Sequence, residues 1–265
     1  MNYSRLLVIL YCSTLFAVFS YRYRDQLRYL RLMRKVERPA KLLGLWNIPR
    51  LSPVIFGIAG GAFLLCLALA ITGVIPRLAL LTSCLLYFLY FGQIRSLSYV
   101  VRKSNLIPQI LFVAALAPGL SRPLVESGPT WPILIAKVLI IQVYVSAGYS
   151  KLSNCGLRWA QSSQLQGILL LQHMKFDIPL AIRIARNDSI CSVLAILTLS
   201  HQITFPIVLF LPRLEPYYVV TALLFHLGTR ILMRIDYLTY QGPAYLTFIV
   251  IPLGHYLPFA HFLGV

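Results

Sequence analysis

Residues 53–75 read PVIFGIAGGAFLLCLALAITGVI, an uninterrupted apolar run without a charged side chain. A helix of about 20 apolar residues matches the thickness of the hydrocarbon core of a bilayer. Only 12% of the 265 residues are charged and 58% are hydrophobic. That charged fraction is about half of what a soluble globular domain carries to cover its surface. We therefore predict an all-α integral membrane protein.

Similar apolar runs follow one another along the chain, joined by short connections without a Pro/Gly/Ser-rich linker. They predict a single transmembrane domain over residues 1–265, built as a bundle of about eight transmembrane helices (seven to nine). The mixed stretch 157–187 is too polar for a simple span and predicts an amphipathic or re-entrant segment packed on the bundle. The spans are expected near residues 6–19, 53–75, 78–94, 106–120, 132–151, 190–211, 217–233 and 244–262.

The charges are strongly unbalanced, with 24 Lys and Arg against 7 Asp and Glu, a formal net charge of +17. Most basic residues lie between the apolar runs, as in cytoplasmic loops of membrane proteins, so we do not expect a nucleic-acid partner. Their distribution predicts an N-terminus outside, with the basic segment 22–50 in the cytoplasm or at the membrane interface. At the N-terminus the basic residues follow the apolar stretch, which predicts a retained first helix instead of a cleaved signal.

The fifth predicted span carries a polar face. Lys137, Ile141, Tyr144, Gly148 and Lys151 are spaced at i, i+4, i+7, i+11 and i+14, which places them on one side of a helix. Polar groups at membrane depth are costly, so this face is predicted to point into the bundle or toward a polar cavity. The alternative is that the two lysines snorkel to the headgroups at opposite ends of the span.

Later spans add three histidines, His201, His226 and His255, of which His226 shares a helix face with Arg230. Three histidines in successive spans favour a shared polar pocket. They lack carboxylate partners at ligand spacing, so we predict no metal site. The few carboxylates of this half lie near segment ends, which argues against acid–base chemistry by a carboxylate pair.

VYVSAGYSKLSNCGLRWAQSSQL, residues 143–165, resembles the signature of the HTTM (horizontally transferred transmembrane) family, the membrane domain shared with vitamin K-dependent gamma-carboxylase. That signature runs from a Tyr-rich helix through Ala-Gly-x-x-Lys-Leu to a Trp, matched here by residues 147–152 and Trp159. LLFHLGTRILM, residues 223–233, resembles the family's later helix. The resemblance covers residues 50–255 or thereabouts.

The resemblance implies a lyase-like chemistry in which Lys151 is the base that deprotonates a reduced quinone, a vitamin K-like hydroquinone. Oxygen then converts the anion into a stronger base and an epoxide, and carbon dioxide adds to a deprotonated glutamate. An apolar pocket disfavours the ammonium and leaves an amine that can take a proton. His226 is then expected to bind the quinol or an oxyanion. The expected pocket residues are Tyr144, Gly148, Trp159, Arg230, His201 and Lys137.

The chain also departs from the carboxylases. They have two adjacent lysines, whereas Ser150 precedes Lys151 here, and they carry a large extramembrane domain without a counterpart in this sequence. Carboxylation of peptide glutamate is therefore the least secure implication, and carboxylation, epoxidation or another oxidation of a lipophilic small molecule is the broader expectation. Two alternatives are a non-enzymatic transporter or partner-binding subunit, and a purely structural bundle. No protein partner can be named from the sequence.

Overall fold

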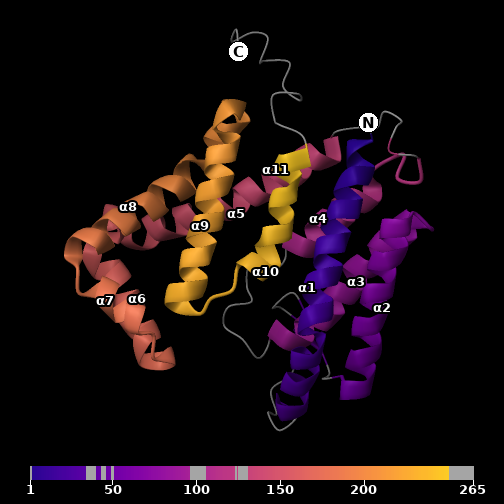
Figure 1. The fold of residues 1–265 in the computed structure, drawn as a ribbon, viewed down its shortest axis with the longest axis horizontal. Helices are drawn as coiled ribbons and strands as arrows, with labels where there is room; N and C mark the ends of the chain where they lie inside the picture. The colour runs from indigo at the N-terminus through magenta and orange to yellow at the C-terminus, as the bar shows by residue number, and fades with distance from the viewer. Residues whose placement is uncertain are drawn as a thin grey trace. The chain divides into compact units, whose positions relative to one another are not determined.

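The fold is that of a computed structural model, which describes residues 2–33, 40–42, 46–48, 51–95, 106–122, 124 and 131–250. These residues are mostly helical (Figure 1). The chain divides into two compact units, of which unit 1 comprises residues 1–136 and 249–251 and unit 2 comprises residues 137–248 and 252–265. The expectation of a single transmembrane domain stays a prediction.

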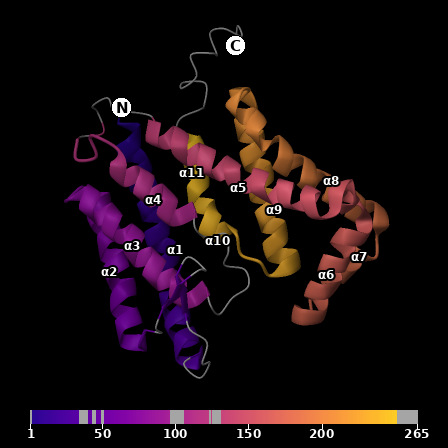
Figure 2. The ribbon, with the colours of Figure 1, turned by 180° about the vertical axis from the view of Figure 1, so that it is seen from behind.

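Unit 1 contains neighbouring helices and one short hairpin of two antiparallel strands. Helices α1, α2 and α3 lie side by side in both ribbon views (Figures 1 and 2). The strands pair antiparallel, with Ala40 opposite Ile48, a small departure from the all-α prediction. The elements are α1 (Tyr3–Met33), β1 (Ala40–Leu42), β2 (Trp46–Ile48), α2 (Pro53–Thr72), α3 (Pro76–Arg95) and α4 (Leu106–Leu116).

Aromatic side chains and one arginine that caps the C-terminal end of α2 join α1 to α2 and α3. Phe19, Phe63 and Tyr87 come from α1, α2 and α3, and their ring centroids lie 5.2–6.0 Å apart. The Arg5 guanidinium of α1 donates hydrogen bonds of 2.6 Å to the carbonyl oxygens of Ala70 and Ile71. Those carbonyls end α2, where a cation complements the negative end of the helix dipole.

Unit 2 begins within α5 and consists of helices and short 3₁₀ turns. Helix α11 runs on past the end of unit 2 at residue 248. The elements are α5 (Trp131–Cys155), η2 (Gly156–Ala160), α6 (Ser162–Phe176), α7 (Pro179–Ala185), α8 (Asp188–Thr204), η3 (Phe205–Leu209), η4 (Pro212–Leu214), α9 (Glu215–Met233), α10 (Leu238–Gln241), η5 (Gly242–Tyr245) and α11 (Leu246–Val250).

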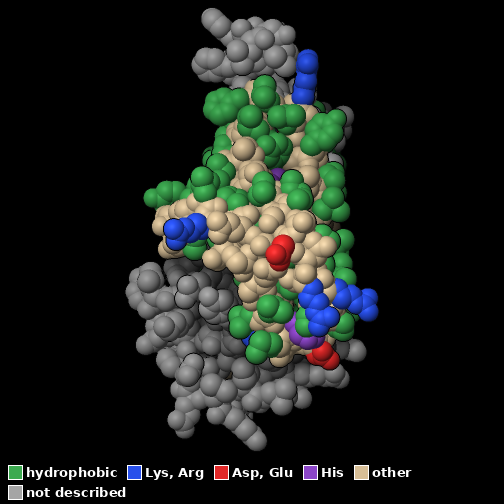
Figure 3. Space-filling view, turned by 90° about the vertical axis from the view of Figure 1, so that its left-hand side faces the viewer, with side chains coloured by type: hydrophobic (Ala, Val, Ile, Leu, Met, Phe, Trp, Pro, Cys, Tyr) green, Lys and Arg blue, Asp and Glu red, His purple; other side chains and the backbone are tan. Residues whose placement is uncertain are grey.

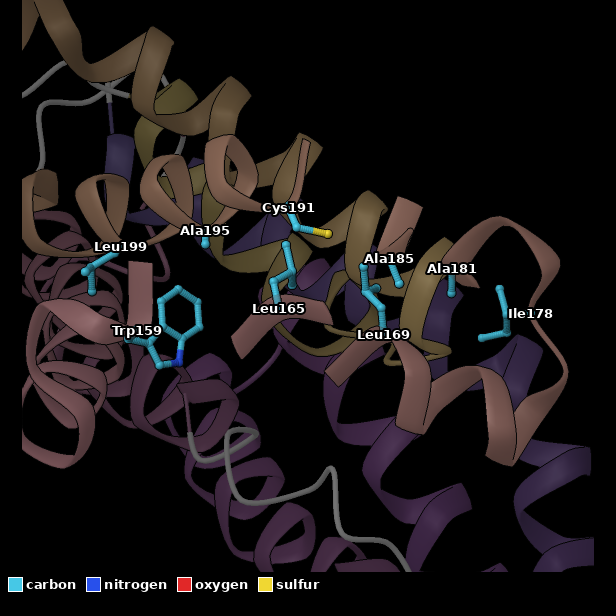
Figure 4. Packing of buried hydrophobic residues seen from close by; sticks show 9 residues of the cluster. All are labelled: Trp159, Leu165, Leu169, Ile178, Ala181, Ala185, Cys191, Ala195 and Leu199. Atoms are coloured by element: carbon cyan, nitrogen blue, oxygen red, sulfur yellow. The ribbon is translucent and has the colours of Figure 1, made fainter. Parts of the chain in front are cut away.

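The stretch predicted as an amphipathic or re-entrant segment forms the hairpin of α6 and α7. Its apolar side chains point toward α8 and make one buried cluster, which Figure 4 shows in close-up. Leu165 of α6 lies beside Ala195 and Cys191 of α8, and Leu169, one turn later, lies beside Ala185 of α7. Trp159 of η2 closes the cluster beside Leu199. The hairpin thereby fixes the place of η2 against α8.

Each of the first seven predicted spans contains a described helix, and α11 lies in the described start of the eighth. Four stretches are long and apolar enough to cross a membrane in the described part of the chain: Tyr3–Tyr23, Pro53–Thr72, Trp131–Ala160 and Asp188–Leu209. The chain is therefore described as a membrane-embedded helical protein, and the full count of eight spans stays a prediction. The first helix is longer than predicted, because residues 20–33 contain neither Gly nor Pro to end it.

The surface is compatible with lipid. Ile58 and Leu65 of α2 and Leu85 of α3 are each more than half exposed. Figure 3 shows hydrophobic side chains gathered in the upper part of one face of the molecule, and basic side chains gathered toward its lower end beside a histidine and an acidic side chain. An apolar surface of this kind is stable in a bilayer, where water does not contact it.

Candidate functional site

The polar face of α5 points inward, as its spacing predicted. Lys137, Ile141, Tyr144 and Gly148 are buried, and Lys151 is half-buried. All of these residues belong to unit 2, where they meet α8, α9 and η5. The face therefore provides the polar groups from which a site inside unit 2 is built.

Lys137 forms a buried ion pair with Glu215, the first residue of α9. Lys137 Nζ lies 2.5 Å from Glu215 Oε1, and the two side chains are 0% and 4% exposed. The acid stands in the first turn of a helix, where the helix dipole favours a negative charge. The snorkelling alternative is therefore wrong for Lys137, because a partner within the helices holds its ammonium.

A tyrosine–histidine cluster, Tyr144, His226 and Tyr245, joins α5, α9 and η5. His226 Nε2 lies 2.8 Å from the Tyr144 hydroxyl and 2.9 Å from the Tyr245 hydroxyl, and the two hydroxyls are also hydrogen-bonded to each other. All three side chains are buried. A buried chain of hydroxyls and an imidazole can pass a proton along it.

His201 of α8 lies on the other side of Tyr144, with ring centroids 5.3 Å apart. Its Nδ1 is 3.2 Å from the Thr221 hydroxyl oxygen, and that hydroxyl is 2.8 Å from the carbonyl oxygen of Tyr217. Because the hydroxyl has one proton and donates it to the carbonyl, it accepts from the Nδ1–H of His201. In this arrangement His201 carries a proton on Nδ1.

A lysine–glutamine cluster, Lys151, Gln202 and Trp159, lies farther along α5. Lys151 Nζ donates to Gln202 Oε1 at 2.8 Å and to the carbonyl oxygen of Ala147 at 3.3 Å, and it sits 4.9 Å from the centre of the Trp159 ring. Gln202 and Trp159 are both buried. The AGxxKL motif and the Trp that follows it thus meet in space at this lysine.

A half-open cavity of about 610 Å³ lies between α8 and α9, with α6 in its wall. Its lining is mainly apolar, including Leu165, Leu224 and Phe225, with polar groups that include His201 and Gln202. Ligand sites in proteins commonly have this composition and volumes of about 300–1,000 Å³. The cavity is therefore the candidate binding site of unit 2.

Lys151 and His226, which were predicted to share a cavity, have different contacts among the described residues, and the shared cavity stays a prediction. Lys151 contacts Gln202 and Trp159, whereas His226 contacts Tyr144, and neither Lys151 nor His226 is among the described residues that line the cavity. The reason is their position along α5, because Tyr144 precedes Lys151 by two turns, about 10 Å of helix. Gln202 links the lysine to the cavity wall instead.

The remaining predicted site residues have different surroundings. Arg230 is exposed on α9, and the described contacts do not bring it to either cluster. His255 lies outside the described residues. Gly148 lies where α5 packs closely against α8, since a Cβ there would lie 3.1 Å from Ile203 Cγ1 and 3.2 Å from Gln202 Cβ.

Gly148→Val is expected to lower the free energy of unfolding by about 1–3 kcal/mol, because the added carbons overlap α8. Gly61→Val in α2 is the matched control, since a Cβ at Gly61 meets nothing within 4 Å and should change stability by about 0.5 kcal/mol or less. Unfolding in mixed micelles titrated with SDS measures both variants. Equal stability of the two variants would contradict the close approach of α5 and α8.

Three residues of the site were not selected from the sequence: Gln202, Glu215 and Tyr245. Gln202 was visible as a polar residue next to His201 within an apolar span, and that signal could have selected it. Glu215 was placed at a segment end, where an acid is ordinarily solvated. Nothing in the local sequence distinguishes Tyr245 from the many other tyrosines of the chain.

Comparisons of the chain with protein-family models, with curated proteins and with solved structures find no match. The resemblance to the HTTM family therefore stays a prediction from motif residues, chiefly Lys151, Trp159 and His226. The cavity and the two polar clusters beside it are the features of unit 2 that bear on function.

Proposed function

We propose that this chain is a membrane-embedded, multi-pass enzyme that binds a reduced quinone or a similar lipophilic substrate in the cavity between α8 and α9. The observation that supports it best is the ring-sized, mainly apolar cavity, with Lys151 hydrogen-bonded to a residue of its wall. The proposal keeps the N-terminus outside and residues 22–50 in the cytoplasm. The reaction class is carboxylation, epoxidation or a related oxidation with oxygen.

The chemistry of the cavity wall fits such a ligand. Its apolar side chains suit a hydrocarbon ring, and His201 and Gln202 offer hydrogen-bonding groups to ring oxygens. A reduced quinone bound there would supply an acidic hydroxyl and reducing equivalents. A ligand oxygen held by Gln202 is one hydrogen-bonding group away from Lys151, whose amine form can take up a proton.

Water exclusion is the second contribution of these residues. Trp159 covers Lys151 with its ring, and Trp159 belongs to the same buried cluster as Leu165 and Leu169, which also line the cavity. Shielding the Lys151 amine from water strengthens its electrostatic interactions and reduces the competition of water for a reactive anion. This surrounding suits a proton acceptor at Lys151.

A second candidate, a non-enzymatic ligand-binding or partner-binding subunit, is favoured by the contacts of the Lys151 amine. The Ala147 carbonyl, the Gln202 amide oxygen and the face of Trp159 are all electron-rich and stabilise an ammonium. A lysine held permanently in that form would hold a ligand without accepting its proton. The behaviour of Lys151→Arg distinguishes the two candidates.

Duroquinone (tetramethyl-1,4-benzoquinone) is expected to quench the fluorescence of Trp159, because quinones accept excitation from a nearby indole. The measurement uses a variant that keeps only this one of the three tryptophans, with Trp46→Phe and Trp131→Phe. Gly228→Leu should weaken duroquinone binding, measured through this quenching, at least tenfold. Gly228 lines the cavity and a Cβ there meets nothing within 4 Å, so the leucine side chain would occupy the space of the ligand.

Gly167→Leu is the matched control for this experiment. Gly167 lies on α6, also with open space around a Cβ, and it is not among the described residues that line the cavity. Its affinity for duroquinone should match that of the parent. If Gly228→Leu and Gly167→Leu bind duroquinone equally well, the cavity between α8 and α9 is not the binding site.

A further inference from the structure

A second, more open cavity of about 540 Å³, here called the α5-end cavity, lies where α5 ends and η2 leads into α6. Its described lining residues all belong to unit 2 and are Asn154, Cys155, Gly156, Leu157, Arg158 and Gln164. None of them is among the described residues that line the cavity between α8 and α9. The α5-end cavity is therefore a separate feature of unit 2, which the proposed reaction does not use.

The α5-end cavity lies where a membrane span reaches the lipid headgroups. Helix α5 has 25 residues, about 37 Å of helix, whereas the hydrocarbon core of a bilayer is about 30 Å thick. Its last two turns carry exposed polar side chains, Ser150, Ser153 and Asn154, so this is the end that extends beyond the hydrocarbon. Leu157 in the cavity lining is 79% exposed, and contact with acyl chains stabilises a leucine that is so exposed.

The cavity offers a positive charge and hydrogen-bond donors. Arg158 is the charged residue of the described lining, and its guanidinium makes no hydrogen bond or ion pair with other described residues. The Gln164 carboxamide is also without such a partner there. Asn154 differs, because its NH₂ group donates to the Ser150 carbonyl oxygen at 2.7 Å. A planar guanidinium beside a carboxamide can donate several hydrogen bonds to one oxyanion.

The charges of the surrounding sequence favour a phosphate as that oxyanion. Residues 151–187 contain one acid, Asp177, and five basic residues, Lys151, Arg158, Lys175, Arg183 and Arg186. Phosphate esters are the oxyanions that a bilayer presents at headgroup depth, and basic segments next to a span attract anionic lipids. Arginine binds phosphate through two parallel N–H donors, a geometry that a lysine cannot reproduce.

We propose that the α5-end cavity binds the phosphate ester of an anionic phospholipid. Arg158 is its main ligand, Gln164 is a second donor, and Leu157 contacts the acyl chains. A soluble phosphate ester has the same chemistry, and the experiment below distinguishes the two sources. The two cavities share no described lining residue, so a result at the α5-end cavity leaves the proposed function unaffected.

Phosphatidylglycerol and phosphatidylcholine, which differ in the net charge of their headgroups, test this site. The purified full chain in dodecyl maltoside is titrated with each lipid, and native mass spectrometry measures the affinity of the first lipid bound. The parent should bind phosphatidylglycerol about tenfold more tightly, because the choline cation of the other lipid is repelled by Arg158. Glycerol 3-phosphate, titrated in the same way, represents the soluble source.

Arg158→Gln is the informative variant, because it removes the charge and the paired donors from an exposed position. It should bind phosphatidylglycerol about tenfold more weakly and lose the preference over phosphatidylcholine. Arg183→Gln is the matched control, since Arg183 is exposed on α7 and is not among the described lining residues. It removes the same charge and should retain the preference.

The lipid preference and its dependence on Arg158 decide the outcome. A preference that survives in Arg158→Gln, or that falls equally in Arg183→Gln, would overturn the site and leave a general attraction to the positive net charge. Equal binding of both lipids by the parent, without Arg158-dependent binding of glycerol 3-phosphate, would also overturn it. Arg158-dependent binding of glycerol 3-phosphate would support the phosphate chemistry with a soluble ligand, and a preference lost only in Arg158→Gln supports the lipid.

Discussion

Replacing Lys137 with methionine is expected to lower the free energy of unfolding by about 3–5 kcal/mol, because the buried Glu215 carboxylate loses its ion-pair partner. The two side chains are 0% and 4% exposed and only 2.5 Å apart, so water cannot replace the lost partner. Methionine is close to lysine in length and fills the same space. The loss of stability is therefore due mainly to the missing charge and not to a missing side-chain volume.

Titration with SDS in mixed micelles measures this change. Lys175→Met is the matched control, because Lys175 is exposed on α6 and should shift stability by about 0.5 kcal/mol or less. The double variant Lys137→Met/Glu215→Leu removes both charges and should recover most of the loss, as apolar replacements of buried pairs often do. A double variant that is no more stable than Lys137→Met would show that the ion pair is not the cause.

Lys151→Arg is expected to reduce durohydroquinone-dependent oxygen uptake by about 10²–10⁴-fold, the usual contribution of a positioned acid–base group. Arginine retains the positive charge and can still donate to Gln202 and stack on Trp159, but it stays protonated and cannot act as a base. The measurement is made on the purified full chain in lipid nanodiscs, with the unfolding transition recorded in parallel.

Lys175→Arg is the control for Lys151→Arg and should leave oxygen uptake unchanged. A Lys151→Arg variant that folds, binds duroquinone and keeps full oxygen uptake would contradict a base at this position. Binding that persists without any uptake in the parent protein would instead favour the non-enzymatic subunit. These measurements separate acid–base chemistry from ligand binding at the same lysine.

The two polar clusters differ in how visible they are in the sequence. Lys151 and Trp159 are close together in the chain, and their motif predicted that they act together. The Trp159 ring centre lies 4.9 Å from Lys151 Nζ, so the two residues are also neighbours in space. Lys137 and Glu215 are 78 residues apart, and neither shows a local pattern that names the other. A local pattern identifies neighbours along the chain, whereas an ion pair depends on which helices meet.

The contacts of Lys151 and His226 illustrate the same limit. Lys151 was predicted on an inward helix face, because the helical period specifies the face, and it is half-buried there. The height at which one helix contacts another depends on the packing of whole side-chain surfaces. His226 meets α5 at Tyr144 and not two turns later at Lys151, and this difference in height is absent from the spacing of either helix.

The amino-acid sequence by itself determined the helical membrane class and the inward face of α5. Long apolar runs must satisfy their backbone hydrogen bonds internally in lipid, and polar residues spaced at the helical period must share one side. Only the tertiary structure decided the partners: Glu215 for Lys137, Tyr245 for His226 and Gln202 for Lys151. The physical reason is that such contacts depend on the relative height and rotation of packed helices, to which residues from many segments contribute.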